Sequence, residues 1–262
     1  MADFSLQLSA SISVSVANSV GTIRLTNPDR HNALSQADWL AIPKAVVKIT
    51  EAEVRVIILY GEGRSFCAGA DISEFDVVRK DPATARVYEA ANSQAFRAVR
   101  EAPIPVLAAM DGYCLGGGFG LAAASDLRLA TPRAVFGVPA ARLGLAYPVD
   151  AMGDIVSAVG TQAAKRLLFT ANRITADEAI TIGFVGELVA EETLLNAANE
   201  LAATIASLAP LTHRATKATI AALSNGDLEG ARALGDATFD SADYAEGRAA
   251  FREKRNPGFN GR

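Results

Sequence analysis

The stretch Asp111-Gly-Tyr-Cys-Leu-Gly-Gly-Gly-Phe-Gly-Leu-Ala-Ala-Ala-Ser-Asp126 decides the fold, because it joins an apolar strand to a small-residue helix through three glycines. Glycine loses more backbone entropy on folding than any other residue, so Gly116, Gly117 and Gly118 indicate bare backbone close to another segment or a ligand. A helix that starts there has unpaired N–H groups and a positive dipole end. The stretch therefore predicts either a site for developing negative charge or a tight strand-to-helix junction without a ligand.

Apolar strands alternate with helical patterns on both sides of this stretch. Val54–Tyr60 and Pro105–Met110 are nearly continuous apolar runs, typical of strands buried on both faces of a parallel sheet. The other expected elements of this half are a hairpin over 11–25, a helix capped by Ser35 that Pro43 kinks or splits, a helix over 82–100, and short strands over 127–130 and 134–136. This alternation predicts an α/β fold in which the loops after successive strands leave one sheet edge.

Beyond residue 140 the pattern becomes almost wholly helical. The expected helices span 149–159, 161–169, 176–182, 193–208, 210–223 and 227–239, with a short strand over 186–189. Pro210 suits a helix start, and it marks a boundary between a core of residues 1–209 and a helical region of residues 210–262. Long helices with apolar faces must pack somewhere, and a partner subunit is a plausible place.

Composition narrows the class of protein. A chain of 262 residues that is 50% hydrophobic can bury a substantial core, and Cys67 and Cys114 cannot form a disulfide framework or a zinc motif. We read both as small buried hydrophobes in a reducing compartment. The 25 basic and 29 acidic residues are mixed along the chain, so the charge pattern does not indicate a nucleic-acid-binding surface. Residues 1–10 lack the pattern of a signal peptide and no stretch suits a membrane span, so we expect a soluble cytoplasmic protein.

Side-chain motifs for common chemistries are missing from the sequence. The dinucleotide fingerprint, the P-loop, GxSxG and HExxH do not occur, and His31 and His213 stand alone, so neither histidine is expected to be catalytic. Two backbone sites remain. Gly69-Ala70 follows one buried strand and Gly117 follows the next, so their N–H groups are expected to converge at one sheet edge. Two such donors would form an oxyanion hole for an enolate or a tetrahedral oxyanion.

Several segments together resemble one known family. Leu25–Ser35, Gly63–Phe75, Gly112–Gly118 and Ser241–Phe259 resemble the corresponding motifs of the enoyl-CoA hydratase/isomerase, or crotonase, superfamily, in order and over nearly the whole chain. The resemblance implies an α/β, crotonase-like spiral of ββα units with a C-terminal helical trimerisation region. It also implies an acyl-CoA thioester substrate, with coenzyme A as part of that substrate, no metal and no separate cofactor, in a homotrimer or dimer of trimers.

The resemblance also implies roles for individual residues. The thioester carbonyl would lie between the N–H groups of Ala70 and Gly117. The residues expected beside the coenzyme A moiety are Ala68, through its backbone carbonyl, Asp71, Ile72 and Ser73, with Arg30 as a weaker candidate for a phosphate contact. By the residues alone, Asp71 is more readily a loop-fixing side chain than a base.

One departure from the family pattern concerns the chemistry itself. Family hydratases use two glutamates to add water, and the matching positions here are Gly120 and Ala140, which cannot transfer a proton. Tyr147 resembles a tyrosine of the methylmalonyl-CoA decarboxylases in this superfamily. Asp150 lies close to the position of the nucleophile in the dehalogenase relatives, although a helix N-cap suits it as well. Arg142 suits either the site or a surface ion pair.

Three functions therefore stay open. The first is an acyl-CoA enzyme of the hydratase/isomerase type that stabilises a thioester enolate. The second is a decarboxylase or other lyase that uses Tyr147, and the third is a non-catalytic acyl-CoA-binding subunit, which the residues Gly120 and Ala140 suggest.

Overall fold

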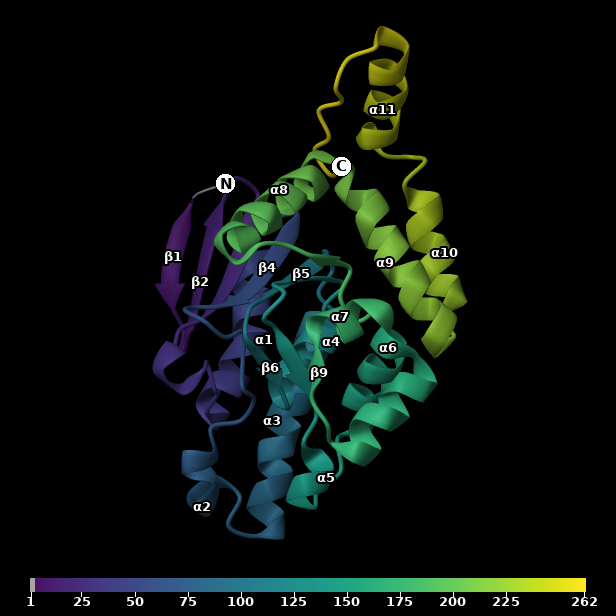
Figure 1. Cartoon of the computed structure of the whole chain (residues 1–262). Helices are drawn as coiled ribbons and strands as arrows, with labels where there is room; N and C mark the ends of the chain where they lie inside the picture. The colour runs from purple at the N-terminus through teal and green to yellow at the C-terminus, as the bar shows by residue number, and fades with distance from the viewer. Residues whose placement is uncertain (1–2) are drawn as a thin grey trace.

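The computed structural model describes residues 3–262, so Met1 and Ala2, which begin the segment where no signal peptide was expected, lie outside the described residues. Within the described chain a central sheet has seven strands in the order β1, β2, β3, β4, β5, β7, β10. Figure 1 shows β1, β2, β4 and β5 of this sheet. Their bounds are Phe4–Gln7, Ile12–Ala17, Val20–Leu25, Val56–Gly61, Val106–Met110, Leu127–Ala130 and Glu187–Leu188. The first three strands pair antiparallel, which confirms the predicted hairpin, and the rest pair parallel.

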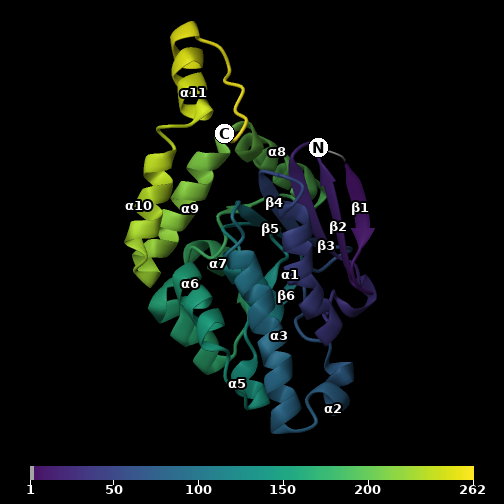
Figure 2. The same cartoon turned by 180° about the vertical axis from the view of Figure 1, so that it is seen from behind.

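Helices cover both faces of the parallel part of the sheet. In β4, Val56 and Ile58 pack in a cluster with α8, Leu194–Ser207, while Ile57 and Leu59 belong to the main core on the opposite face. Successive side chains of a strand point to opposite faces, so this strand is apolar at every one of these positions. Figure 2 shows α1, Gln36–Thr50, and α3, Pro82–Arg100, lying against the sheet on the main-core side.

Local signals set the helix boundaries. Ser35 and Asp38 form a capping box at the start of α1, and Asp81 and Thr84 form another at the start of α3. Of the two predicted effects of Pro43, a kink or a split, the split is wrong, because α1 runs unbroken from Gln36 to Thr50. A proline inside a helix removes one hydrogen bond, and the buried face of α1, which includes Trp39 and Ile42, holds the helix together across that loss.

A second, smaller sheet brings the two glycine-rich segments together. It consists of β6, Tyr113–Leu115, which pairs with β8, Val135–Gly137, and of β9, Ile174–Thr175. A bridge between Cys67 and Cys114 ties the loop after β4 to β6. Both cysteines are free and fully buried, as predicted, and burial raises the pKa of the Cys67 thiol to about 12, so the thiol stays protonated.

The remaining helices of the core flank these segments. They are α2, Phe75–Val78, α4, Gly117–Ala124, α5, Ala140–Leu143, α6, Val149–Thr170, and α7, Ala176–Thr181. The predicted interruption of α6 at Gly160 is confirmed, because Gly160 has φ 75° and ψ 160° inside the assigned helix. None of the helices within residues 3–262 is both long and apolar enough to cross a bilayer.

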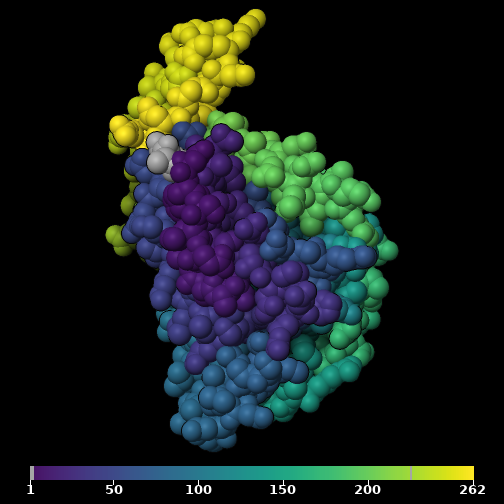
Figure 3. Space-filling model, turned by 90° about the vertical axis from the view of Figure 1, so that its left-hand side faces the viewer, coloured from purple at the N-terminus to yellow at the C-terminus, as the bar shows by residue number. Residues whose placement is uncertain are grey.

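The C-terminal helices extend away from the sheet. They are α9, Pro210–Asn225, α10, Leu228–Ala237, and α11, Ala242–Glu253, and the last of these was not predicted as a helix. Figures 1 and 3 show α11 and the C-terminal tail as a projection at one end of the molecule. Lys217 anchors α9 to the core through an ion pair of 2.7 Å with Asp126.

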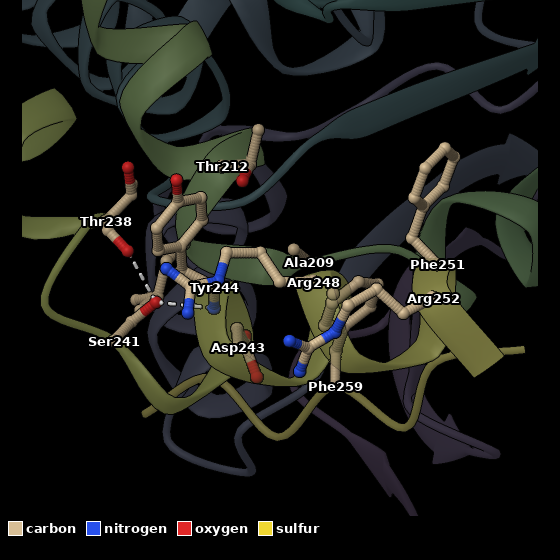
Figure 4. A pocket seen from close by; sticks show the side chains of 12 residues that line it. Ala209, Thr212, Thr238, Ser241, Asp243, Tyr244, Arg248, Phe251, Arg252 and Phe259 are labelled. Carbon is tan, nitrogen blue, oxygen red and sulfur yellow. Dashed lines mark hydrogen bonds between the residues drawn. The ribbon is translucent and has the colours of Figure 1, made fainter.

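A cavity of about 630 Å³ lies at the base of this projection. It is lined by the start of α9, by α11 and by Phe259 of the tail, with Thr238, Ser241 and Tyr244 linked by hydrogen bonds on one side (Figure 4). Its lining comes from residues 209–259 and includes none of the residues predicted to bind the thioester.

Candidate functional site

The structure brings the two predicted glycine-rich loops into contact. Gly69 has φ +99°, and a Cβ atom on it would lie 3.2 Å from the nitrogen of Gly117 and 2.9 Å from the carbonyl oxygen of Leu115. Gly116, the N-cap of α4, also has a positive φ, of 54°. Bare backbone is therefore needed at both positions, because a side chain on either would be strained and one on Gly69 would separate the loops.

The N–H groups of this contact are available to a ligand. Gly117 is the first residue of α4, where the helix offers no acceptor. In the facing loop, the N–H of Gly69 points to the sulfur of Cys67 and the N–H of Asp71 donates to the carbonyl of Leu34 at 2.8 Å. Ala70 lies between Gly69 and Asp71 in the chain, and its N–H donates to no acceptor among the described residues. Two neighbouring free donors beside a helix start can stabilise an oxyanion.

One buried pair of side chains supports both loops. The Trp39 ring packs on Gly117, where a Cβ atom would lie 2.7 Å from the ring. The Trp39 Nε1–H donates to the hydroxyl of Tyr88 at 3.0 Å, and that hydroxyl donates to the carbonyl of Leu34 at 3.2 Å. Leu34 in turn forms a bridge with Ala70. The pair thus links the backbone that carries one donor to the backbone that carries the other.

A small cavity opens beside the donors. Its volume is about 130 Å³, and the residues that line it are Ala68, Ala70, Ile72, Phe75, Arg79, Glu89, Asn92, Phe96, Gly116, Gly117, Pro139, Ala140, Leu143, Leu145, Tyr147 and Pro148. Of the residues predicted to lie beside coenzyme A, Ala68 and Ile72 are in this lining, and Asp71, Ser73 and Arg30 are not. The lining is apolar except for four side chains that come from α3, from the residue after α2 and from the residues before α6.

Arg30, Asp71 and Ser73 form a hydrogen-bonded cluster next to the cavity. The guanidinium of Arg30 donates to the Asp71 carboxylate at 3.0 Å and to the Ser73 hydroxyl at 2.7 Å, and the N–H of Ser73 donates to Asp71 at 3.0 Å. Partial burial raises the pKa of Asp71, but the bonds from Ser73 and Arg30 outweigh it and lower the pKa overall. These contacts fit the predicted loop-fixing role of Asp71, and a base at this position would be a weak one.

The three candidate side chains before and within α6 lie in different places relative to the cavity. Tyr147 lines the cavity, and its hydroxyl would lie 3.7 Å from a Cβ atom on Gly116; burial raises its pKa, so it is a neutral phenol. Asp150 is not in the cavity lining and forms an ion pair of 3.8 Å with Arg97. The N-cap reading of Asp150 is wrong, because Pro148 is the N-cap of α6. Arg142 is exposed and donates to Asn172 at 3.4 Å, outside the cavity.

Sequence reasoning missed four residues of the cavity wall. Glu89, Asn92 and Phe96 lie on α3, and Arg79 follows α2 and is paired with Glu89. The spacing 89, 92, 96 places the three α3 side chains on one helix face. A carboxylate and an amide on the otherwise apolar face of a helix were a visible signal for a cavity on that side.

Aromatic packing fills the space above Gly120. A Cβ atom on Gly120 would lie 2.7 Å from the Phe96 ring, and the ring reaches the cavity wall. Ala140, the first residue of α5, is buried and also lines the cavity. Neither position carries a group that can bind or release a proton.

Comparison with known proteins identifies the family. The sequence model described as enoyl-CoA hydratase/isomerase matches residues 15–262. The chain belongs to the enoyl-CoA hydratase/isomerase family. Its mixed α/β fold, with a central sheet flanked by helices, is the fold of the solved members of this family. An enoyl-CoA hydratase/carnitine racemase from Magnetospirillum magneticum superposes with a TM-score of 0.91 at 34% identity, covering 97% of each chain.

Individual members of the family differ in their reactions. A crotonyl-CoA hydratase from Syntrophomonas wolfei is 35% identical over 246 residues, which cover 92% of this chain and 94% of the relative. A methylmalonyl-CoA decarboxylase from Escherichia coli is 30% identical over 258 residues, which cover 95% and 98%. Membership in the enoyl-CoA hydratase/isomerase family therefore supports acyl-CoA processing and leaves the reaction to be argued from the side chains.

Proposed function

We propose that this protein is an acyl-CoA enzyme that stabilises a thioester enolate between the N–H groups of Ala70 and Gly117. The observation that supports the proposal is the contact between Gly69 and Gly117, which brings the loop of Ala70 against the start of α4. One donor of this kind contributes about 3 kcal/mol to transition-state stabilisation in related oxyanion holes. The apolar cavity beside the donors offers room for the acyl group.

We further propose that this chain is a member without the two hydratase glutamates. The resemblance to the family places those glutamates at positions 120 and 140, which hold Gly and Ala. The Phe96 ring takes the space that a longer side chain at position 120 would need. Water addition to an enoyl thioester requires a base for water and an acid for the α carbon, so the proposed reaction is enolate chemistry of the isomerase type.

The backbone donor of Ala70 can be removed by substitution. Ala70→Pro deletes the N–H, and Ala70→Ser, the matched control, keeps it. Exchange of the α protons of butyryl-CoA in D2O, followed by mass spectrometry, reports enolate formation directly. We expect exchange in the wild type and in Ala70→Ser, and a loss of about 10²- to 10³-fold in Ala70→Pro. Equal exchange in the two variants would remove Ala70 from the site.

A second candidate function rests on the Tyr147 hydroxyl. It lies beside Gly116 in the cavity, and as a neutral phenol it can donate a hydrogen bond to a carboxylate on the α carbon. Decarboxylation of a malonyl-type thioester also produces an enolate, and it needs no base. Release of CO2 from methylmalonyl-CoA by the wild type, with a clear reduction in Tyr147→Phe, would establish this reaction.

The same assays address a non-catalytic role. Binding of butyryl-CoA without α-proton exchange, together with no release of CO2 from methylmalonyl-CoA, is the result expected of an acyl-CoA-binding subunit.

A further inference from the structure

The cavity wall contains one carboxylate among the described residues, and it comes from α3. Glu89, Asn92 and Phe96 stand on the face of α3 that lines the cavity. The Glu89 side chain is 28% exposed, so it is neither fully solvated nor sealed in the core. The cavity is small, with room for about four water molecules, so several of its lining groups can contact the same acyl group.

Arg79 holds this carboxylate in place. The guanidinium is paired with Glu89 and lies over the rings of Phe75 and Tyr88, at 4.7 and 4.5 Å from their centroids. Two aromatic contacts and an ion pair fix the side chain far more firmly than an exposed pair would. The ion pair therefore keeps the carboxylate in a fixed place on the cavity wall.

The pair belongs to the same site as the oxyanion donors. Arg79 and Tyr147 both line the cavity, and the Tyr147 hydroxyl lies beside Gly116. Tyr88, whose ring contacts Arg79, donates to Leu34, the residue bridged to Ala70. The carboxylate and the two N–H groups are therefore connected through directly contacting residues across a cavity that they share.

The helix that supplies the carboxylate also fills the space over Gly120. Phe96 stands two turns after Glu89 on α3, and its ring packs on Gly120 of α4. An acidic side chain is thus absent from α4 and present on the neighbouring helix, and both helices border the same cavity.

We infer that Glu89 is the general base of this site and that it moves a proton between carbons of an unsaturated acyl thioester. This inference rests on the proposed function, because the enolate it forms is the one that Ala70 and Gly117 stabilise. Glu89 takes a proton from the α carbon of a 3-enoyl thioester, and the C–H electron pair passes to the thioester oxygen as a dienolate. The proton then returns to the γ carbon, which moves the double bond into conjugation. Atoms and charge balance without water, oxidant or metal.

The probe for this step is 3-butenoyl-CoA, whose isomerisation is followed by the rise of the conjugated thioester absorbance. We expect turnover by the wild type and a reduction of about 10²- to 10⁴-fold in Glu89→Gln, the range of a general base. Binding of butyryl-CoA, measured by calorimetry, should stay within about twofold in that variant. Glu89→Asp should recover part of the rate, since it restores a carboxylate on a shorter side chain.

Glu101→Gln is the matched control, because Glu101 is an exposed carboxylate at the far end of the same helix. It should isomerise 3-butenoyl-CoA at the wild-type rate. A Glu89→Gln protein that turns over like the wild type would overturn the inference and leave the oxyanion hole intact. A Glu89→Gln protein that loses butyryl-CoA binding and turnover together would assign Glu89 to structure, which also overturns it. A wild type that shows no α-proton exchange would overturn the proposed function itself.

Discussion

Two missing Cβ atoms explain much of what distinguishes this site. Gly117 leaves room for Trp39, and Gly120 leaves room for Phe96, at separations where any Cβ would collide with the ring. The first contact fixes the helix start that carries a donor, and the second makes one wall of the cavity aromatic. The identity of position 120 is therefore tied to position 96, and the two should be changed together.

Installing the absent acid at position 120 tests this coupling. Gly120→Glu should destabilise the protein by about 1 to 3 kcal/mol, because its Cβ overlaps the Phe96 ring in a packed core, and it should not gain crotonyl-CoA hydration. The double variant Gly120→Glu with Phe96→Ala should lose less free energy of unfolding than the two single variants lose together. Urea unfolding and the loss of enoyl thioester absorbance measure the two effects.

The control for this pair is Gly153→Ala on α6, where a Cβ atom would meet no neighbour within 4 Å. It should leave stability unchanged or raise it by up to about 1 kcal/mol. A Gly120→Glu protein as stable as the wild type and active in hydration would contradict the coupling.

At the scale of elements, a buried carboxylate lies between α3 and α6. Asp154 of α6 pairs with Arg100 at 2.8 Å, while Arg97 pairs with Asp150 at 3.8 Å one turn away. Burial, with repulsion from Asp150 and Glu101, outweighs the attraction of Arg100 and raises the pKa of Asp154 to about 6.

A raised carboxyl pKa predicts a falling stability with rising pH. Between about pH 4 and pH 6 the folded state keeps a proton on Asp154 that the unfolded state has released, so the free energy of unfolding decreases through that window. Asp154→Asn removes the titration. Its free energy of unfolding should equal that of the wild type near pH 4 and exceed it by on the order of 2 kcal/mol at pH 7. Urea midpoints at the two pH values measure the difference.

The control is Ser157→Ala, which changes an exposed, non-ionisable residue on the same helix. Its free energy of unfolding should differ from that of the wild type by the same amount at both pH values. An Asp154→Asn protein less stable than the wild type at pH 7 would show that the Arg100 ion pair outweighs burial.

The elements that the sequence predicted correctly are those that local chemistry specifies. The Ser35 cap, the interruption at Gly160 and the helix start within the triple glycine each depend on neighbouring residues alone. Pro43 does not split α1, because tertiary packing of the helix outweighs the local preference.

The residues of the candidate site likewise include some that the sequence could locate and others that depend on tertiary packing. Its glycine-marked backbone loops could be located from sequence, since the chain order of the buried strands brings those loops together. For Glu89 the only sequence signal was its place on an otherwise apolar helix face, and Arg79 had none, because their contact across the cavity wall depends on how α2, α3 and α6 pack against one another. Asp150 lies only three residues from Tyr147 and is still not in the cavity lining, which sequence proximity alone could not indicate.

At the scale of the whole molecule, the C-terminal helices expose apolar side chains that the core does not cover. Phe251 of α11 is 86% exposed, Leu223 of α9 is 75% exposed and Phe239 after α10 is 63% exposed. Monomeric proteins rarely leave large apolar side chains together in solvent without a partner. We propose that residues 210–262 form an oligomerisation region and that the protein is a homotrimer or a dimer of trimers.

Phe251→Ser tests this assembly. Each fully buried Phe contributes about 1.5 to 3 kcal/mol, and in a symmetric oligomer the loss is repeated at every interface. Light scattering after gel filtration should therefore give a mass of about three or six chains of 27.3 kDa for the wild type and a smaller mass for the variant at the same micromolar concentration. The control is Val47→Ser, which removes a half-exposed apolar side chain from α1, outside residues 210–262. It should keep the wild-type mass. A monomeric wild type would exclude the assembly, and an unchanged mass in Phe251→Ser would move the interface away from α11.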